Sequence, residues 1–100
     1  MTYRLAYTTA YLNDLERHID WLQTQGVAPH VIEQWYEPLF ERIETLPDLP
    51  LSHPIDEAFS AELNQPVRKL IFGNYLIFYR IVEAQQRIEI LSFRHGATRR

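Results

Sequence analysis

Two segments rich in β-branched and aromatic residues meet at the dipeptide Gly73-Asn74 in the last third of the chain. Residues 67–72 and 75–82 have the composition that favours β-strands. A two-residue connection with glycine first is typical of a type II′ hairpin turn, so we expect these strands to pair antiparallel. Residues 83–86 then turn the chain, and residues 87–93 alternate again. We therefore predict a three-stranded antiparallel meander.

The first residues predict one short strand followed by a helix. Large apolar side chains alternate over residues 3–8, which indicates a half-buried strand. Thr8 or the next threonine can cap a helix that runs to residue 25, just before a glycine that suits its end. Asn13 and Glu16 form an alternative capping box about one turn later.

A second helix is predicted from Pro29 to Leu46, because proline is favoured in a first helical turn and an apolar stripe of helical period follows it. Only residues 26–28 separate the two helices, which favours an antiparallel helical hairpin. Pro38 interrupts the stripe and removes a backbone donor, so we expect a kink there or a split into two shorter helices.

Residues 47–66 contain four prolines and little apolar periodicity, which indicates a connecting loop with a short helical turn at Glu57–Leu63. The order of elements is then strand, helix, helix, loop and three strands. This order predicts an α+β fold. We expect a small antiparallel β-sheet, made of the N-terminal strand and the C-terminal three-strand meander, packed against the N-terminal α-helical hairpin.

Length and composition restrict the class of protein further. A chain of 100 residues supplies one core of ordinary size, so we expect a single domain over residues 1–100. It has no cysteine, no apolar run long enough for a membrane span and no leader-like start, which favours a cytoplasmic protein. No phosphate-binding loop, nucleophile elbow or paired-histidine metal motif is present, so we expect no metal and no cofactor.

The histidines and large aromatic residues of the first half are expected to have structural roles. The three isolated histidines are assigned to the surface or to packing, and they are His18, His30 and His53. Four aromatic residues are large enough to be binding hot spots, and they are Trp21, Trp35, Tyr36 and Phe40. Core packing is the expected role of most of these four.

The net charge of -3 conceals an uneven distribution. Residues 1–66 hold eleven acidic and three basic side chains, whereas residues 67–100 hold seven basic and two acidic ones. Such a split suggests a face that meets an anionic partner. The candidate partner-binding residues are Arg68, Lys69, Arg80, Arg94, His95 and Arg99. The alternative, that these are solvated charges on a sheet face and in a basic tail, stays open.

The order of elements and several short segments resemble the RelE/ParE toxins of bacterial type II toxin–antitoxin systems, over nearly the full chain. The segments that carry the resemblance are Tyr3-Arg4-Leu5-Ala6-Tyr7, the hairpin end Leu46-Pro47, Pro66-Val67-Arg68-Lys69-Leu70, Gly73-Asn74-Tyr75-Leu76-Ile77-Phe78-Tyr79-Arg80, and Ile88-Glu89-Ile90-Leu91 leading to Arg94-His95-Gly96-Ala97. The Tyr79-Arg80 ending, followed by a strand and a His-Gly turn, is most similar to the ParE branch, often described as plasmid stabilisation proteins.

Two activities are known in this family. RelE-like members cut messenger RNA in the ribosome, and a member of that kind would use Arg68 and Lys69 as cations and His95 as an acid or base. Leu76 stands where such nucleases typically carry an arginine, and the chain ends at Arg100 where some of them carry a tyrosine. The nuclease set is therefore expected to be incomplete.

ParE-like members poison DNA gyrase without being nucleases. The resemblance thus implies a toxin that inhibits growth by binding DNA gyrase. It also implies a small cognate antitoxin whose C-terminal segment wraps the toxin. Two alternatives remain: a ribosome-dependent mRNA endoribonuclease, and a non-toxic relic that only binds an antitoxin.

Overall fold

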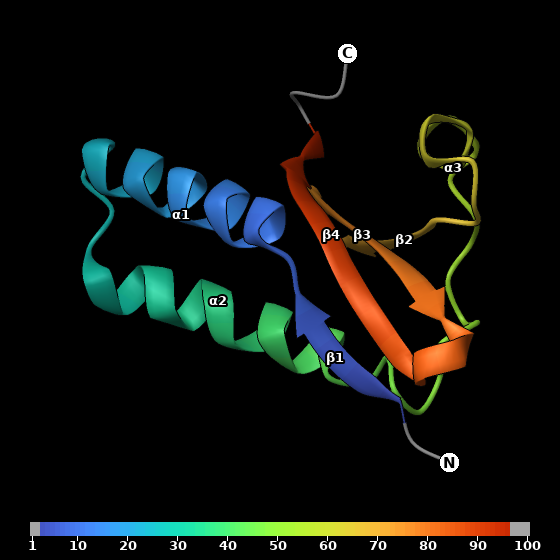
Figure 1. Ribbon diagram of the computed structural model, residues 1–100. Coiled ribbons are helices and arrows are strands. Elements are labelled where there is room, and N and C mark those ends of the chain that lie inside the picture. The colour runs from blue at the N-terminus through green and yellow to red at the C-terminus, as the bar shows by residue number, and fades with distance from the viewer. Residues whose placement is uncertain (1–2, 97–100) are drawn as a thin grey trace.

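The computed structural model describes residues 3–96 (Figure 1). The elements in chain order are β1 (Arg4–Tyr7), α1 (Thr9–Thr24), α2 (Pro29–Ile43), α3 (Glu57–Leu63), β2 (Arg68–Phe72), β3 (Tyr75–Val82), a short 3-10 turn (Glu83–Gln85) and β4 (Arg87–His95). The predicted order of elements and the α+β class are confirmed, and the short helical turn in the connecting loop is α3.

The four strands form one sheet in the order β1-β4-β3-β2. The predicted meander is confirmed, because β3 pairs antiparallel with both β2 and β4. Its first turn has φ +59° at Gly73, and Asn74 has no positive φ, which is the type II′ pattern. A β-bulge interrupts the pairing of β3 with β4 near Phe78, so Leu91 has no direct partner on β3.

The expectation that the whole sheet is antiparallel is wrong at one strand, because β1 pairs parallel with β4. The sheet is therefore mixed. Alternation in the sequence identifies which side of a strand is buried, but the direction of its neighbour depends on the connection between them. Parallel pairing requires a long crossover connection. Here that connection contains α1, α2, α3, β2 and β3, which all lie between β1 and β4 in the sequence.

Local sequence signals determine where the helices begin. The Thr8 hydroxyl caps α1 by accepting a hydrogen bond from the Tyr11 backbone N–H at 3.1 Å, so the alternative start at Asn13 is wrong. Pro29 occupies the first turn of α2 as predicted. Pro38 does not split α2, which is a single helix ending at Ile43 rather than at Leu46. Pro38 is exposed, so water can solvate the carbonyl group left without a partner.

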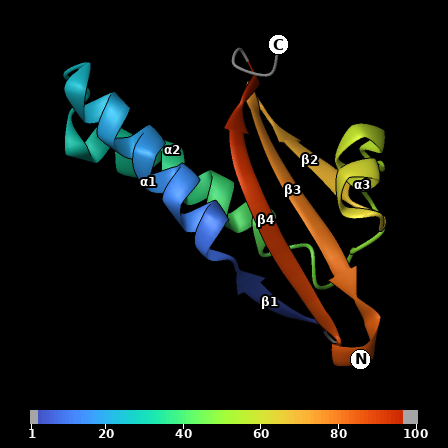
Figure 2. The ribbon, with the colours of Figure 1, turned by 45° about the horizontal axis from the view of Figure 1, so that its top comes forward.

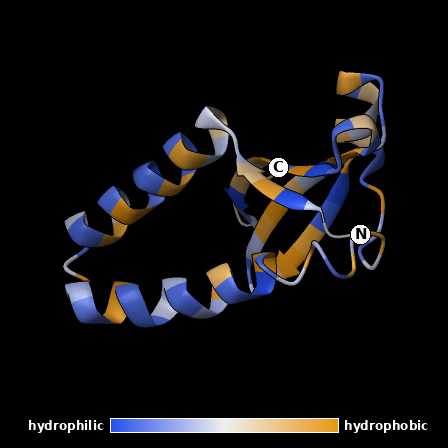
Figure 3. Cartoon of the chain, turned by 60° about the horizontal axis from the view of Figure 1, so that its bottom comes forward, coloured by the Kyte–Doolittle hydropathy of each residue, from blue (hydrophilic) through white to orange (hydrophobic). Residues whose placement is uncertain are grey.

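The helical hairpin of α1 and α2 lies on one face of the sheet, and α3 lies beside the opposite face (Figure 2). We call these the hairpin face and the α3 face. Both helices alternate polar and apolar residues, while apolar residues predominate on the strands (Figure 3). The larger core lies on the hairpin face, and its fully buried members include Leu39, Ile43, Ile77, Tyr79 and Ile90. A smaller cluster on the α3 face joins Val67, Leu76 and Phe78 to the partly buried Phe59 of α3.

Within residues 3–96, no helix combines the length and the apolar character needed to cross a membrane. In the same part of the chain, no three metal-ligating side chains gather in one place.

Candidate binding groove

One stripe of α1 and the C-terminal end of β4 enclose an open groove with a volume of about 540 Å³. We call it the aromatic groove, and its lining residues are Asp14, Arg17, His18, Trp21, Phe93, Arg94 and His95. The α1 members occur at intervals of three and four residues, which places them along one side of a helix. Trp21 is the most prominent apolar member, because 53% of its surface is exposed.

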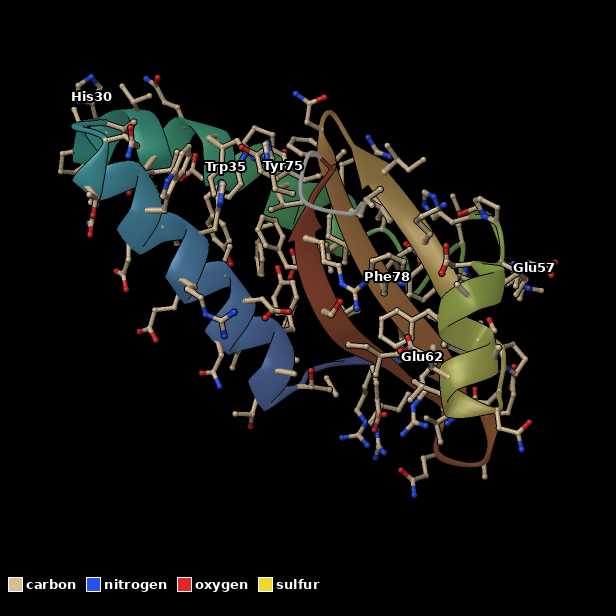
Figure 4. All side chains as sticks on the ribbon, turned by 90° about the horizontal axis from the view of Figure 1, so that it is seen from above. His30, Trp35, Glu57, Glu62, Tyr75 and Phe78 are labelled. Atoms are coloured by element: carbon tan, nitrogen blue, oxygen red, sulfur yellow. The ribbon has the colours of Figure 1, made fainter. Side chains whose placement is uncertain are left out.

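The floor of the aromatic groove is a cluster of packed rings centred on His18. The His18 ring centroid lies 5.1 Å from that of Tyr75, 5.3 Å from Trp35 and 5.4 Å from Phe93. His18 Nε2 and the Tyr75 hydroxyl oxygen are 3.2 Å apart and share a hydrogen bond. Figure 4 shows Trp35 of α2 and Tyr75 of β3 close together where the hairpin meets the sheet. Three elements besides β4 therefore contribute packed rings to this floor.

The titratable side chains of the aromatic groove are His18, Asp14 and Arg17 on α1 and Arg94 and His95 on β4, and those of α1 differ in charge and in exposure. Burial, followed by the proximity of His95, lowers the pKa of His18 below its ordinary value, so this ring is neutral at neutral pH. Asp14 joins α1 to β4, since its Oδ2 accepts a hydrogen bond from the Phe93 backbone N–H at 3.2 Å. Asp14 also lies 3.7 Å from Arg17, whose side chain is 76% exposed. An exposed guanidinium and an exposed indole thus stand side by side at the rim.

The structure separates the first two predicted basic residues. Arg68 donates from Nη1 to the His53 carbonyl oxygen at 2.7 Å, and so holds the connecting loop on the hairpin side of β2. Lys69 lies on the α3 face, where its Nζ is 3.4 Å from Asp56 Oδ1. Asp56 also caps α3 by accepting from the Phe59 backbone N–H. Both cations therefore have structural partners.

The other predicted basic residues are dispersed as well. Arg80 forms an ion pair of 2.6 Å with Glu89. The Arg94 guanidinium lies over the rings of Phe59 and Phe78 on the α3 face, 5.1 Å from each centroid, although Arg94 is also among the residues that line the aromatic groove. His95 lines this groove, and Arg99 lies outside the described residues. No single site contains the predicted set, and its role in partner binding stays a prediction.

The three residues named for a nuclease do not meet. His95 is opposite Tyr75 and Arg68 is opposite Tyr79, so they are four positions apart along β3, about 13 Å at the usual rise of a strand. Lys69 is on the other face of the sheet, because it pairs with Phe78. A phosphate could not contact all three at once.

Sequence reasoning missed three α1 members of the groove, which are Asp14, Arg17 and His18. The sequence predicts only a surface or packing role for His18, and it does not single out Asp14 or Arg17. The signal that identifies them is the spacing of Asp14, Arg17, His18 and Trp21, which gathers unlike polar and aromatic groups in one stripe. His30 is exposed, and His53 packs edge-on against Tyr79, which agrees with their expected roles.

Comparisons with known proteins agree with this architecture. Residues 5–100 match the family model described as ParE toxin of type II toxin–antitoxin system, parDE. No match was found among curated proteins. The fold is similar to a chain in the RelBE2 toxin–antitoxin complex from Mycobacterium tuberculosis, with a TM-score of 0.57 and 20% sequence identity. That similarity covers 95% of this chain and 99% of the other. Because the family model spans almost the whole sequence, the chain belongs to the ParE toxin family of type II toxin–antitoxin systems.

Proposed function

We propose that this toxin inhibits bacterial growth by binding DNA gyrase in the cytoplasm, and that a cognate antitoxin neutralises it. The observation that carries the proposal is the separation of Arg68, Lys69 and His95, the three residues that the resemblance implies for a nuclease of this kind. Inhibition by binding requires no such set. It requires a surface that a protein partner can recognise.

The aromatic groove has the properties of a protein-binding site. Trp21 is half exposed, although burial in a core would be the expected fate of a tryptophan. It stands beside Arg17 and above a floor of packed rings. Tryptophan and arginine are enriched among residues that contribute most to binding free energy, and such residues cluster in well-packed parts of an interface. These features support the groove as the contact surface for the target.

A supercoiling assay with purified gyrase tests the proposal. The wild-type protein is expected to inhibit supercoiling or to trap cleaved DNA. Trp21→Ala is expected to raise the half-inhibitory concentration at least about tenfold, because hot-spot truncations commonly cost 2 kcal/mol or more. Leu12→Ala is the matched control, since Leu12 is equally exposed on the opposite side of α1 and should leave inhibition unchanged. Folded wild-type protein without effect at micromolar excess would refute gyrase binding.

The endoribonuclease remains the second candidate, because His95 lines the aromatic groove and could serve there as an acid–base group. Ribosomes programmed with a defined mRNA distinguish the two. Our proposal expects an intact transcript. Cleavage by the wild-type protein that is abolished by His95→Ala would contradict our proposal and identify the protein as an mRNA endoribonuclease.

Growth of cells that express the chain tests two further points: neutralisation by an antitoxin, and the alternative that the chain is a non-toxic relic. Expression of the chain alone is expected to stop growth, and coexpression of its antitoxin to restore it. Normal growth with ample soluble protein would instead indicate a relic without toxicity.

A further inference from the structure

Three arginines lie on the α3 face of the sheet, at the end formed by the start of β1 and β4. Ile88 and Ile90 point into the core under the hairpin, so alternation places Arg87 and Glu89 on the opposite face. Arg4 is the direct partner of Arg87 across β1 and β4, and Arg80 is the direct partner of Glu89 across β3 and β4. We call Arg4, Arg80 and Arg87 the arginine patch.

Glu89 holds two of these guanidinium groups in fixed positions. Its Oε1 accepts a hydrogen bond from Arg80 Nε at 2.7 Å and lies 2.6 Å from Arg80 Nη2 in an ion pair, and its Oε2 accepts hydrogen bonds from Arg87 Nε at 3.0 Å and Nη2 at 2.6 Å. Burial acts to raise the pKa of Glu89, but the hydrogen bonds from Arg80 and Arg87 outweigh it and lower the pKa below its ordinary value. The carboxylate is therefore ionised and fixes both arginines at neutral pH.

Donor capacity remains after this pairing. Each paired arginine uses Nε and Nη2 for Glu89, which leaves Nη1 for another acceptor, and each side chain is still 28% exposed. Arg4 is exposed and has no carboxylate within ion-pair distance among the described residues. On this face three arginines meet one glutamate, while Glu83 at the same end of the sheet accepts a hydrogen bond from Tyr3, which packs against the hairpin-face core, so positive charge is in excess on the α3 face.

We propose that the arginine patch binds an acidic peptide segment of a protein partner. A guanidinium offers paired planar donors that match a carboxylate, and fixing it in advance lowers the entropic cost of binding. Residues 1–66 carry eight excess negative charges, so the long phosphate backbone of a nucleic acid would meet repulsion beyond the patch. A short segment with two or three carboxylates would occupy only the patch.

This site is separate from the aromatic groove. The groove lies between α1 and the C-terminal end of β4, whereas the patch begins at the N-terminal end of β4, on the opposite face. The inference therefore does not depend on gyrase binding.

Fluorescence anisotropy with a short labelled glutamate-rich peptide tests the proposal at about 150 mM salt, where long-range attraction is screened. The wild-type protein is expected to bind it saturably. Arg4→Gln is expected to weaken binding about tenfold, the effect of one lost charge-assisted contact, and adding Arg87→Gln to weaken it further. Arg42→Gln, an exposed arginine of α2 on the hairpin side, is the control and should bind as the wild type does.

Each result of the peptide-binding experiment leads to a different conclusion. Arg4 makes no ion pair with any side chain of residues 3–96, so Arg4→Gln should keep the wild-type melting temperature and remains informative if the Arg87 variant is unstable. The proposal would be overturned if the wild-type protein does not bind the peptide saturably, or if Arg42→Gln weakens peptide binding as much as Arg4→Gln does. Tighter binding of a single-stranded RNA or duplex DNA probe that is lost in Arg4→Gln would overturn the choice of an acidic peptide and indicate a nucleic-acid surface.

Discussion

Thr8 connects the first helix to the sheet, and its replacement by alanine provides a strong test of the fold. Its hydroxyl accepts from the Tyr11 backbone N–H at 3.1 Å and donates to the Ile90 carbonyl oxygen at 2.7 Å. One oxygen thus caps α1 and joins it to β4. Thr9 is the next residue, is exposed, and makes neither contact.

The two contacts give the expected magnitude. Loss of an N-cap side chain costs about 1 kcal/mol, and loss of a partly buried hydrogen bond costs about 1 kcal/mol more. Thr8→Ala should therefore lower the free energy of unfolding by about 2 kcal/mol, a large part of the total for a domain of this size. The melting temperature should fall by about 8–16 °C.

Urea denaturation followed by tryptophan fluorescence and circular dichroism measures this change. Thr8→Ser keeps the hydroxyl and should recover most of the stability. Thr9→Ala should change the free energy of unfolding by less than about 0.5 kcal/mol. Equal destabilisation by Thr8→Ala and Thr9→Ala, or no recovery in Thr8→Ser, would refute the argument.

Two further predictions concern pH. The pKa of His18 is lowered by burial, so the unfolded chain binds a proton more readily than the folded one, and stability should fall as the pH drops through the unfolded pKa of about 6.5. His18→Gln should therefore reduce the change of the urea midpoint between pH 8 and pH 5. The same change of midpoint in the variant and the wild type would contradict this. The pKa of Glu89 is lowered in the fold, so its contribution is present above the unfolded pKa of about 4.3 and disappears as the pH falls through the folded pKa. Glu89→Gln should therefore cost about 2 kcal/mol near pH 7 and progressively less in acid, as measured by urea unfolding at each pH. A cost that does not change with pH would show that the ionised carboxylate is not its source.

The secondary structure was largely predictable because its determinants are local. A glycine with positive φ sets the turn at Gly73, a hydroxyl that accepts from the backbone N–H three residues later starts α1, and a proline in the first turn starts α2. The boundary errors are equally instructive. The apolar stripe continues to Leu46, which is fully buried, although the helix itself has ended at Ile43. Burial alone does not require helical geometry.

The direction of β1 and the separation of the basic residues were not predictable by the same means. The partners that decide them are distant in the sequence: Lys69 meets Asp56, Arg68 meets the His53 carbonyl, and Arg80 meets Glu89 across a strand pair. The aromatic groove has the same origin. It exists because packing brings the α1 stripe at Asp14 and His18 to the end of β4.

Sequence alone specified an α+β chain with a helical hairpin, a C-terminal meander and a basic last third, because capping, turn and periodicity rules act over a few neighbouring residues. The tertiary structure decided which charges are available to a partner. Arg68 and Lys69 belong to interactions that hold the connecting loop and α3, whereas Arg4 beside the sheet and Arg17 at the groove are exposed. The physical reason is that an ion pair or a groove depends on distances between side chains, which chain folding sets and residue order does not.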